Sequence, residues 1–136
     1  MPMYLLDTDT VIYSLKGHPT VKVNLERHRQ AVLKISVVTL MELYYGAYKS
    51  QRVTSNLGKI KSIEEAIEIV SLGRESAEVF AMLKANLEKS GTPLDDFDLM
   101  LAASALVHDL VLVTNNIKHF ERVEGLRLAN WARESA

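Results

Sequence analysis

The chain has no cysteine among its 136 residues. This absence excludes disulfide bonds, thiolate zinc sites and cysteine nucleophiles together, and it fits a reducing cytoplasm. Carboxylates and histidines are left as metal ligands. No stretch approaches the ~20 consecutive apolar residues that a membrane-spanning helix needs, and the N-terminus lacks the basic segment and apolar core of a secretory signal. We therefore expect a soluble, cytoplasmic protein without a membrane partner.

The chain also lacks an excess of positive charge. Lysine and arginine number 16 against 17 aspartate and glutamate residues, which gives a formal net charge of −1. Without an overall positive field, any binding to nucleic acid must rely on a local patch. The 48% hydrophobic and 24% charged residues give an ordinary globular balance, with enough apolar material for one good core. We expect one domain spanning residues 1–136.

Apolar runs that alternate with helical segments indicate the fold class. The run Met3–Leu6 shows no alternation, which is typical of a strand covered on both faces. Four later segments have strand character: Ala31–Val37, Ala66–Leu72, Leu110–Val113 and Gly125–Leu128. Helical segments lie between the strands: Thr10–Lys16, Thr20–Arg29, Leu40–Ala47, Tyr48–Ile63, Glu75–Lys89 and Leu99–Val107. This order predicts an α/β fold with a central parallel sheet flanked by helices.

Three carboxylates occupy informative positions. Asp7 directly follows the first strand, and the carboxyl ends of parallel strands border the ligand crevice of open α/β sheets. Thr8 and Thr10 then offer hydroxyls to cap the following helix. Glu42 lies among apolar residues of a helix and Asp98 opens the most apolar helix, where an unpaired charge would cost several kcal/mol. A magnesium ion would resolve this conflict and orient water for phosphodiester cleavage; the alternative is that each acid only caps or borders a helix.

Four ordered motifs around these acids resemble the PIN-domain family. They are LLDTD at 5–9, ISVVTLMELYYGA at 35–47, PLDDFDLMLAA at 93–103 and LVTNNIKHFERVEGL at 112–126. More narrowly, the chain resembles the VapC-type ribonuclease toxins of toxin-antitoxin pairs, from Tyr4 to Trp131. The resemblance implies a Rossmann-like three-layer sandwich and a Mg²⁺ or Mn²⁺ site made by Asp7, Glu42 and Asp98. It also implies cleavage of structured RNA, such as loops of transfer or ribosomal RNA.

The chain departs from the family pattern at two positions. Relatives often carry a further acid where this chain has Asn116 or His119, so a fourth metal carboxylate is in doubt. Asn116 can still hold a water or a phosphate oxygen, and His119 can bind phosphate or donate a proton to a leaving oxygen. The alternative is a turn residue and a solvated histidine. Fewer negative ligands should weaken the metal site rather than abolish it.

Other polar residues of the same motifs complete the expected site. Thr114 ends a strand, and the resemblance implies that its hydroxyl orients Asp7 or binds a substrate phosphate; Asn115 follows it directly. A routine cap is the alternative for Thr114. Asp9 stands where relatives often have Asn, and we expect it to cap the helix rather than to support the site as an additional carboxylate.

The segment after Glu42 is rich in positive charge and tyrosine. It contains Tyr44, Tyr45, Tyr48, Lys49, Arg52, Lys59 and Lys61. These residues could contact RNA backbone and stack bases, or form a solvated face with core tyrosines. The resemblance implies a third use, because VapC-type toxins offer this region to the C-terminal segment of a VapB-like antitoxin, which reaches an Arg or Lys into the acids. A homodimer is also implied by resemblance alone.

Two other functions stay open. The sequence Asp-Thr-Asp at 7–9 matches the start of haloacid-dehalogenase-like phosphatases, but that family places its acidic pair after its Ser/Thr motif, whereas Asp98 precedes Thr114. A catalytically weak PIN scaffold that binds RNA or a partner is supported by Asn116 and His119. Because the three main acids are present, we predict a Mg²⁺-dependent endoribonuclease toxin.

Overall fold

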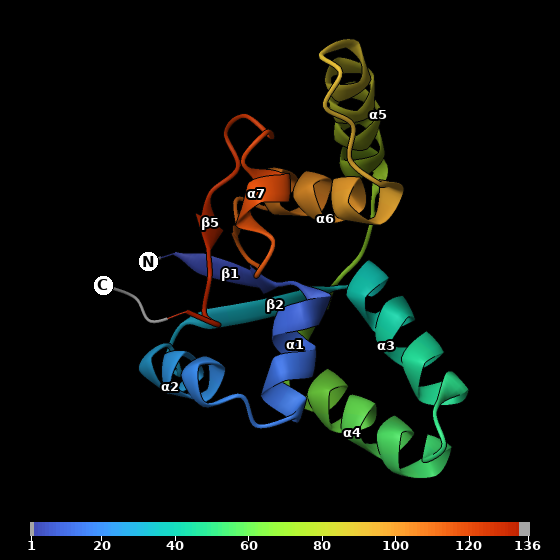
Figure 1. Ribbon diagram of the computed structural model, residues 1–136, viewed down its shortest axis with the longest axis vertical. Coiled ribbons are helices and arrows are strands. Elements are labelled where there is room, and N and C mark those ends of the chain that lie inside the picture. Colours follow the sequence, from blue (N-terminus) through green and yellow to red (C-terminus); the bar gives the residue numbers. More distant parts are fainter. Residues whose placement is uncertain (1, 134–136) are drawn as a thin grey trace.

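A five-stranded parallel sheet forms the centre of the protein, as the computed structural model shows for residues 2–133 (Figure 1). The strands are β1 (Met3–Leu6), β2 (Val32–Ser36), β3 (Glu68–Val70), β4 (Val111–Val113) and β5 (Leu128–Ala129). Their order in the sheet is β3-β2-β1-β4-β5, and every pair is parallel. The predicted α/β class with a central parallel sheet is confirmed.

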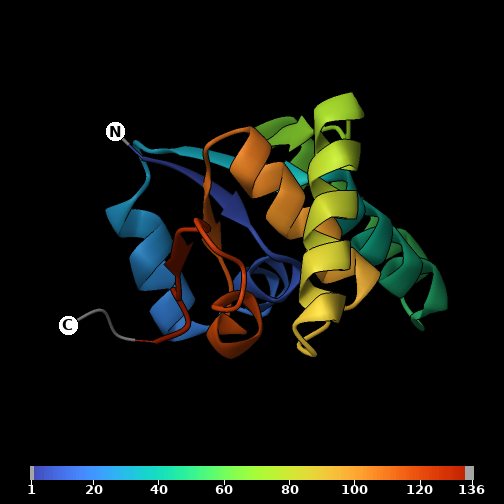
Figure 2. The same cartoon turned by 90° about the horizontal axis from the view of Figure 1, so that it is seen from above.

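Helices cover both faces of the sheet. One layer contains α1 (Thr8–Leu15), α2 (Pro19–Arg27), α3 (Val37–Lys49) and α4 (Val53–Ala66). The other contains α5 (Arg74–Lys89), α6 (Asp96–Val107) and the short α7 (Ile117–Phe120). Figure 2 shows α6 between α5 and the sheet, which explains why its side chains are apolar on all sides. Within residues 2–133, no helix is both long and apolar enough to cross a membrane.

Neighbouring residues of β1 supply two separate cores. Leu5 is fully buried in the core beneath α5 and α6, whereas Leu6 packs into the core beneath α1, α3 and α4. Leu112 and Val113 of β4 divide in the same way. Because successive side chains of a strand point to opposite faces, a strand covered on both sides needs an unbroken apolar run. The run Met3–Leu6 meets this requirement.

The strand order reverses between β1 and β4. From β1 the chain builds β2 and β3 on one side, and it then returns to place β4 on the other side of β1. Ligands of open α/β sheets bind at such a reversal, outside the carboxyl ends of the strands. Asp7 follows β1 there and Thr114 follows β4, and the backbone N–H of Asp7 donates to the Val113 carbonyl over 2.9 Å.

Several predicted element bounds were wrong. Tyr48–Ile63 was expected as one helical segment, but α3 ends at Lys49 and α4 begins at Val53. Helix α1 begins at Thr8 rather than Thr10 because Asp7 itself is its N-cap: one carboxylate oxygen accepts from the Thr8 N–H at 2.6 Å. The last strand was expected at Gly125–Leu128, but Gly125 has a φ of 82°, which places it in a turn before β5.

Candidate active site

The Asp7 carboxylate is buried and accepts two hydrogen bonds. Its side chain caps α1 through Oδ1, and Oδ2 accepts from the Thr114 hydroxyl at 2.8 Å. Burial raises the pKa of Asp7 from 3.8 to about 7, with the negative charges of Asp9 and Asp98 adding to the rise and the two hydrogen bonds opposing it. This position therefore holds a negative charge only at a considerable cost in free energy.

Thr114 connects Asp7 to the loop after β4. Its side chain is fully buried, and its hydroxyl oxygen accepts from the backbone N–H of Asn116 at 3.0 Å while donating to Asp7. One hydroxyl thus fixes both the carboxylate that ends β1 and the loop that begins α7. Of the two uses implied by the resemblance, orientation of Asp7 is the one that the hydrogen bond supports.

Glu42 comes from α3, on the apolar side of the crevice. The helix is capped by Ser36, whose hydroxyl accepts from the Val38 N–H at 3.1 Å, so the end of β2 determines where Glu42 lies. Glu42 Oε1 accepts from the Thr8 hydroxyl at 2.7 Å. The predicted capping role of Thr8 is wrong, because its hydroxyl instead holds an acid of another helix. The Thr8 and Thr39 hydroxyl oxygens are 3.2 Å apart.

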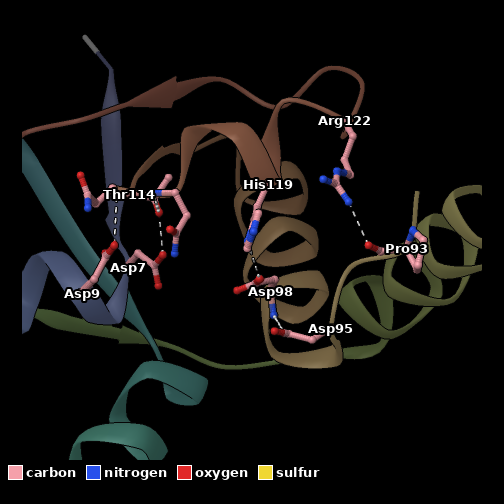
Figure 3. Close-up of polar contacts among 10 residues, drawn as sticks. Asp7, Asp9, Pro93, Asp95, Asp98, Thr114, His119 and Arg122 are labelled. Atoms are coloured by element: carbon pink, nitrogen blue, oxygen red, sulfur yellow. Dashed lines mark hydrogen bonds and ion pairs between the residues drawn. The ribbon is translucent and has the colours of Figure 1, made fainter. Parts of the chain in front are cut away.

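Asp98 enters the crevice from the first turn of α6. The cap of this helix is Asp95, whose carboxylate accepts from the Asp98 N–H at 2.9 Å. Burial raises the pKa of Asp98, and the charges of Asp95, Glu42 and Asp9 act in the same direction, whereas His119 opposes them. The imidazole Nδ1 of His119 lies 3.8 Å from Asp98 Oδ2 (Figure 3). His119 is therefore part of the site's electrostatics.

Asp9 does not cap α1, contrary to expectation. Its Oδ2 accepts from the backbone N–H of Asn115 at 3.1 Å, so it joins α1 to the β4–α7 loop (Figure 3). Burial raises the pKa of this carboxyl group as well. The Thr10 hydroxyl donates to the Val113 carbonyl over 3.2 Å and likewise does not cap the helix. Both side chains contact the end of β4 or the loop after it, about a hundred residues away in the sequence, and local sequence patterns do not predict such contacts.

The acids fit a hard divalent cation by chemistry. The charges of Asp9 and Asp98 act on Asp7, those of Glu42 and Asp9 act on Asp98, and all four acids offer only oxygen ligands, which Mg²⁺ prefers. As they lie in the structure, no three His, Asp or Glu side chains among residues 2–133 are close enough to hold an ion together. Two of the acids accept hydrogen bonds from threonine hydroxyls, Asp7 from Thr114 and Glu42 from Thr8.

Apolar cavities adjoin the acids on the side of α1, α3 and α4. One, of about 330 Å³, is lined by Ile12, Leu43 and Ile60 among others and reaches Glu42. Another, of about 570 Å³, lies between Thr8, Glu42 and exposed Tyr45 and Phe97. We call these two cavities together the apolar groove.

The tyrosines of this region have different environments. Tyr44 is half-buried and its hydroxyl donates to Glu64 of α4, so it joins α3 to α4. Tyr45 and Tyr48 are each 67% exposed, and the Lys49 ammonium lies 5.4 Å from the centre of the Tyr45 ring. Of the alternatives for these tyrosines, the structural role therefore applies to Tyr44, while Tyr45 and Tyr48 are available to a partner.

Comparison with known proteins agrees with this arrangement. The PIN domain family model matches residues 4–126, and the chain belongs to the PIN-domain family. Among its relatives are VapC ribonucleases. It is 37% identical to the tRNA(fMet)-specific endonuclease VapC of Shigella flexneri over 132 residues, which cover 97% of this chain and 100% of that protein. It is 36% identical to ribonuclease VapC2 of Haemophilus influenzae over 131 residues, covering 96% and 99%.

Solved structures show the same fold. DNA-bound VapBC from Salmonella typhimurium has a TM-score of 0.88 and 34% identity, covering 96% of this chain and 99% of that chain. VapBC2 from Rickettsia felis, bound to a DNA fragment from its promoter, has a TM-score of 0.88 and 33% identity, covering 95% and 98%. The predicted resemblance to the PIN-domain family is confirmed. The phosphatase alternative is wrong because the chain belongs to the PIN-domain family and not to the haloacid-dehalogenase-like phosphatases.

Proposed function

We propose that this protein is an endoribonuclease toxin of a toxin-antitoxin pair, which cleaves transfer RNA with the help of Mg²⁺. One observation supports the proposal: Asp98 of α6 interacts electrostatically both with Asp7, at the end of β1, and with Glu42 of α3, near the reversal of the strand order. The names of the VapC relatives indicate RNA as substrate, and two of them specify tRNA(fMet). Because transfer RNA is a cytoplasmic molecule, the proposal includes a cytoplasmic location.

In this proposal Asp7, Glu42 and Asp98 hold the ion, with Mn²⁺ as an alternative to Mg²⁺. When bound, such an ion activates water and neutralises charge on the phosphate. In the hydrolysis the attacking water would lose a proton and bond through its oxygen to phosphorus, the bond from phosphorus to one ester oxygen would break, and that ester oxygen would take up a proton. His119, exposed and beside Asp98, is placed to contact the phosphate or to supply this proton.

Several neighbours position the acids rather than react. Thr114 holds Asp7 and Thr8 holds Glu42, each through its hydroxyl. Asp9 fixes the β4–α7 loop through the Asn115 N–H; the expected substrate-binding side chains of Asn115 and Asn116 lie in that loop, and that of His119 lies in α7, which follows it. Preorganisation of this kind lets a site act without rearranging during the reaction.

The proposed protein partner is a VapB-like antitoxin that occupies the apolar groove. Solved relatives are VapBC complexes, and the groove here combines apolar walls with Glu42, which lines both of its cavities. A cationic side chain of a partner segment that lies in the groove would face the acids and pair with them. A homodimer stays a prediction from the resemblance.

The alternative is a scaffold that binds RNA without cutting it, which the presence of Asn116 and His119 in place of acids favours. Cleavage of total cellular RNA and of initiator tRNA by the purified, antitoxin-free protein separates the two. We expect discrete fragments with Mg²⁺ and none with EDTA or with Asp7→Asn. Absence of fragments from the folded wild-type protein under every condition would favour the scaffold.

A further inference from the structure

A third cavity lies beside the acids, between the β4–α7 loop and the chain that follows β5. It has a volume of about 530 Å³, and its walls carry three carboxamides, two permanent cations and an imidazole. These groups belong to Asn115, Asn116, Asn130, Lys118, Arg133 and His119. We call this cavity the amide-cation pocket.

The amide-cation pocket shares its wall with the acid site. The backbone N–H of Asn115 donates to Asp9, and the His119 ring lies against Asp98. The loop that forms the pocket is therefore the loop that borders the carboxylates. A ligand in the amide-cation pocket would therefore lie next to the carboxylates of Asp9 and Asp98.

Hydrogen bonds orient two of the carboxamides in the pocket. The Asn130 carboxamide donates to the side-chain oxygen of Asn115 over 3.2 Å, and its own oxygen accepts from the Ala132 N–H at 2.9 Å. The Asn115 amide nitrogen lies 3.4 Å from the Tyr13 hydroxyl, to which it donates. Fixed carboxamides lose little conformational entropy when a ligand binds, so their hydrogen bonds can contribute to affinity and selectivity.

The charge of the pocket differs from that of the whole chain. Its lining contains two cations, Lys118 and Arg133, and a single carboxylate, Glu121, although the chain has a net charge of −1. Cations recognise phosphate, whereas carboxamides pair with base edges and with the ribose 2′-hydroxyl. A nucleotide offers both kinds of partner, a phosphate for the cations and a base edge and ribose for the carboxamides, so the combination favours a nucleotide.

We propose that the amide-cation pocket binds the ribonucleotide next to the scissile phosphate. Lys118 and Arg133 contact phosphate oxygens, and the carboxamides contact the ribose and the base. This inference rests on the proposed RNA cleavage, which brings a phosphodiester to the neighbouring acids. It assigns Lys118, Asn130 and Arg133 a role in binding the substrate.

The salt dependence of RNA binding tests the proposal. In the Asp98→Asn background, we would measure the affinity for fluorescently labelled initiator tRNA at several salt concentrations, for Lys118→Ala and Arg133→Ala. Both side chains are exposed, so the fold should be unaffected. Each substitution should weaken binding about tenfold and lower the log–log salt slope by about one, as loss of one phosphate contact predicts. Lys89→Ala and Arg74→Ala on α5, also exposed, are matched controls that should leave the slope unchanged.

The outcomes separate this inference from the proposed function. Wild-type salt slopes in both pocket variants would overturn it, even if the active protein cleaves tRNA. Retained tRNA affinity with lost affinity for the antitoxin would also overturn it, in favour of a protein ligand. In the active protein, Lys118→Ala should raise KM and leave kcat unchanged. If the wild type binds tRNA with these contacts but does not cut it, the pocket assignment stands and the proposed catalysis fails.

Discussion

The two sides of the acid site differ in chemistry. On the side of α1, α3 and α4 the crevice continues into the apolar groove, whose walls include Leu43, Ile60 and the exposed rings of Tyr45 and Phe97. On the side of α7 and β5 it continues into the amide-cation pocket, with Lys118 among its cations. An apolar groove suits a protein segment, whereas a polar, positively charged pocket suits RNA.

This difference shows how one site can serve two binders. The four acids lie between the two surfaces: Glu42 borders the apolar groove, and Asp9 and Asp98 border the amide-cation pocket. In the functions proposed above, a protein segment reaches the acids from one side and RNA from the other, so we expect the two to compete at the acids. Substitutions in the centre should therefore affect both functions, and substitutions on either side should affect one.

The largest effect is expected at the centre. Asp98→Asn should reduce RNA cleavage about a thousandfold, because it removes a charge proposed to hold the ion while preserving volume. Asp96→Asn is the matched control: Asp96 lies in the same helical turn, is exposed and pairs only with Lys84 at 2.9 Å among the described residues. Initial rates of cleavage of initiator tRNA measure the activity of the two variants, and melting curves check that both are folded. Wild-type cleavage by Asp98→Asn would contradict the site.

Asp7 should make the metal-free protein sensitive to pH. Burial raises the pKa of Asp7 from 3.8 in the unfolded state to about 7 in the folded state. Between these two pH values, the folded protein keeps a proton on Asp7 that the unfolded protein has released. This contribution to stability is fully present below pH 3.8 and is lost as the pH rises through about 7. The loss amounts to about 2–4 kcal/mol.

Asp7→Asn removes that titration. In EDTA, the variant should gain stability relative to the wild type as the pH rises from 4 to 8, a range that spans the shift from 3.8 to about 7. Urea unfolding at several pH values measures the difference, with Asp96→Asn as control. A difference between Asp7→Asn and the wild type that does not change with pH would contradict the raised pKa.

The apolar groove offers a substitution that should affect the partner alone. Gly46 lines it, and a Cβ there meets no atom within 4 Å, so Gly46→Gln should fill the groove without disturbing α3. Affinity for the antitoxin should fall about tenfold, while the rate of RNA cleavage stays unchanged. Gly58→Gln on α4, where a Cβ is equally unobstructed, should change neither. Calorimetric titration with antitoxin measures the affinity, and a parallel loss of cleavage would contradict the separation of the two sides.

The smallest effect is expected at Thr8. Thr8→Val removes the hydroxyl that donates to Glu42 but keeps the side-chain shape. Cleavage should fall about fivefold, which corresponds to the ~1 kcal/mol of a typical hydrogen bond. Thr8→Ser should restore it, and Thr54→Val, at an exposed position of α4, should have no effect. Equal rates for Thr8→Val and Thr8→Ser would show that the hydrogen bond does not position Glu42.

Patterns confined to neighbouring residues predicted the fold. The unbroken run Met3–Leu6 became a strand buried on both faces, and the apolar segment Leu99–Val107 became a helix between two layers. The helix expected over Glu75–Lys89 became α5, and Gly91, with a φ of 73°, follows its end. Each of these features depends on properties that are local in sequence.

The hydrogen bonds of the site could not be predicted in this way. Thr8 meets Glu42 across 34 positions and Thr114 meets Asp7 across 107, so both contacts depend on the order of strands in the sheet. Only the family resemblance pointed to the contact between Thr114 and Asp7. Nothing in the sequence pointed to the contact between Thr8 and Glu42 or to a role for Asn130. The participation of Asp7, Glu42 and Asp98 in a metal site stays a prediction.

Calorimetric titration of the antitoxin-free protein with Mg²⁺ tests the central claim most directly. If the acids at the sheet reversal form one metal site, the wild type and Asp96→Asn should bind the ion, and Asp7→Asn and Asp98→Asn should lose most of that binding. Equal Mg²⁺ affinity in all four proteins would contradict the claim, because the ion would then be bound elsewhere.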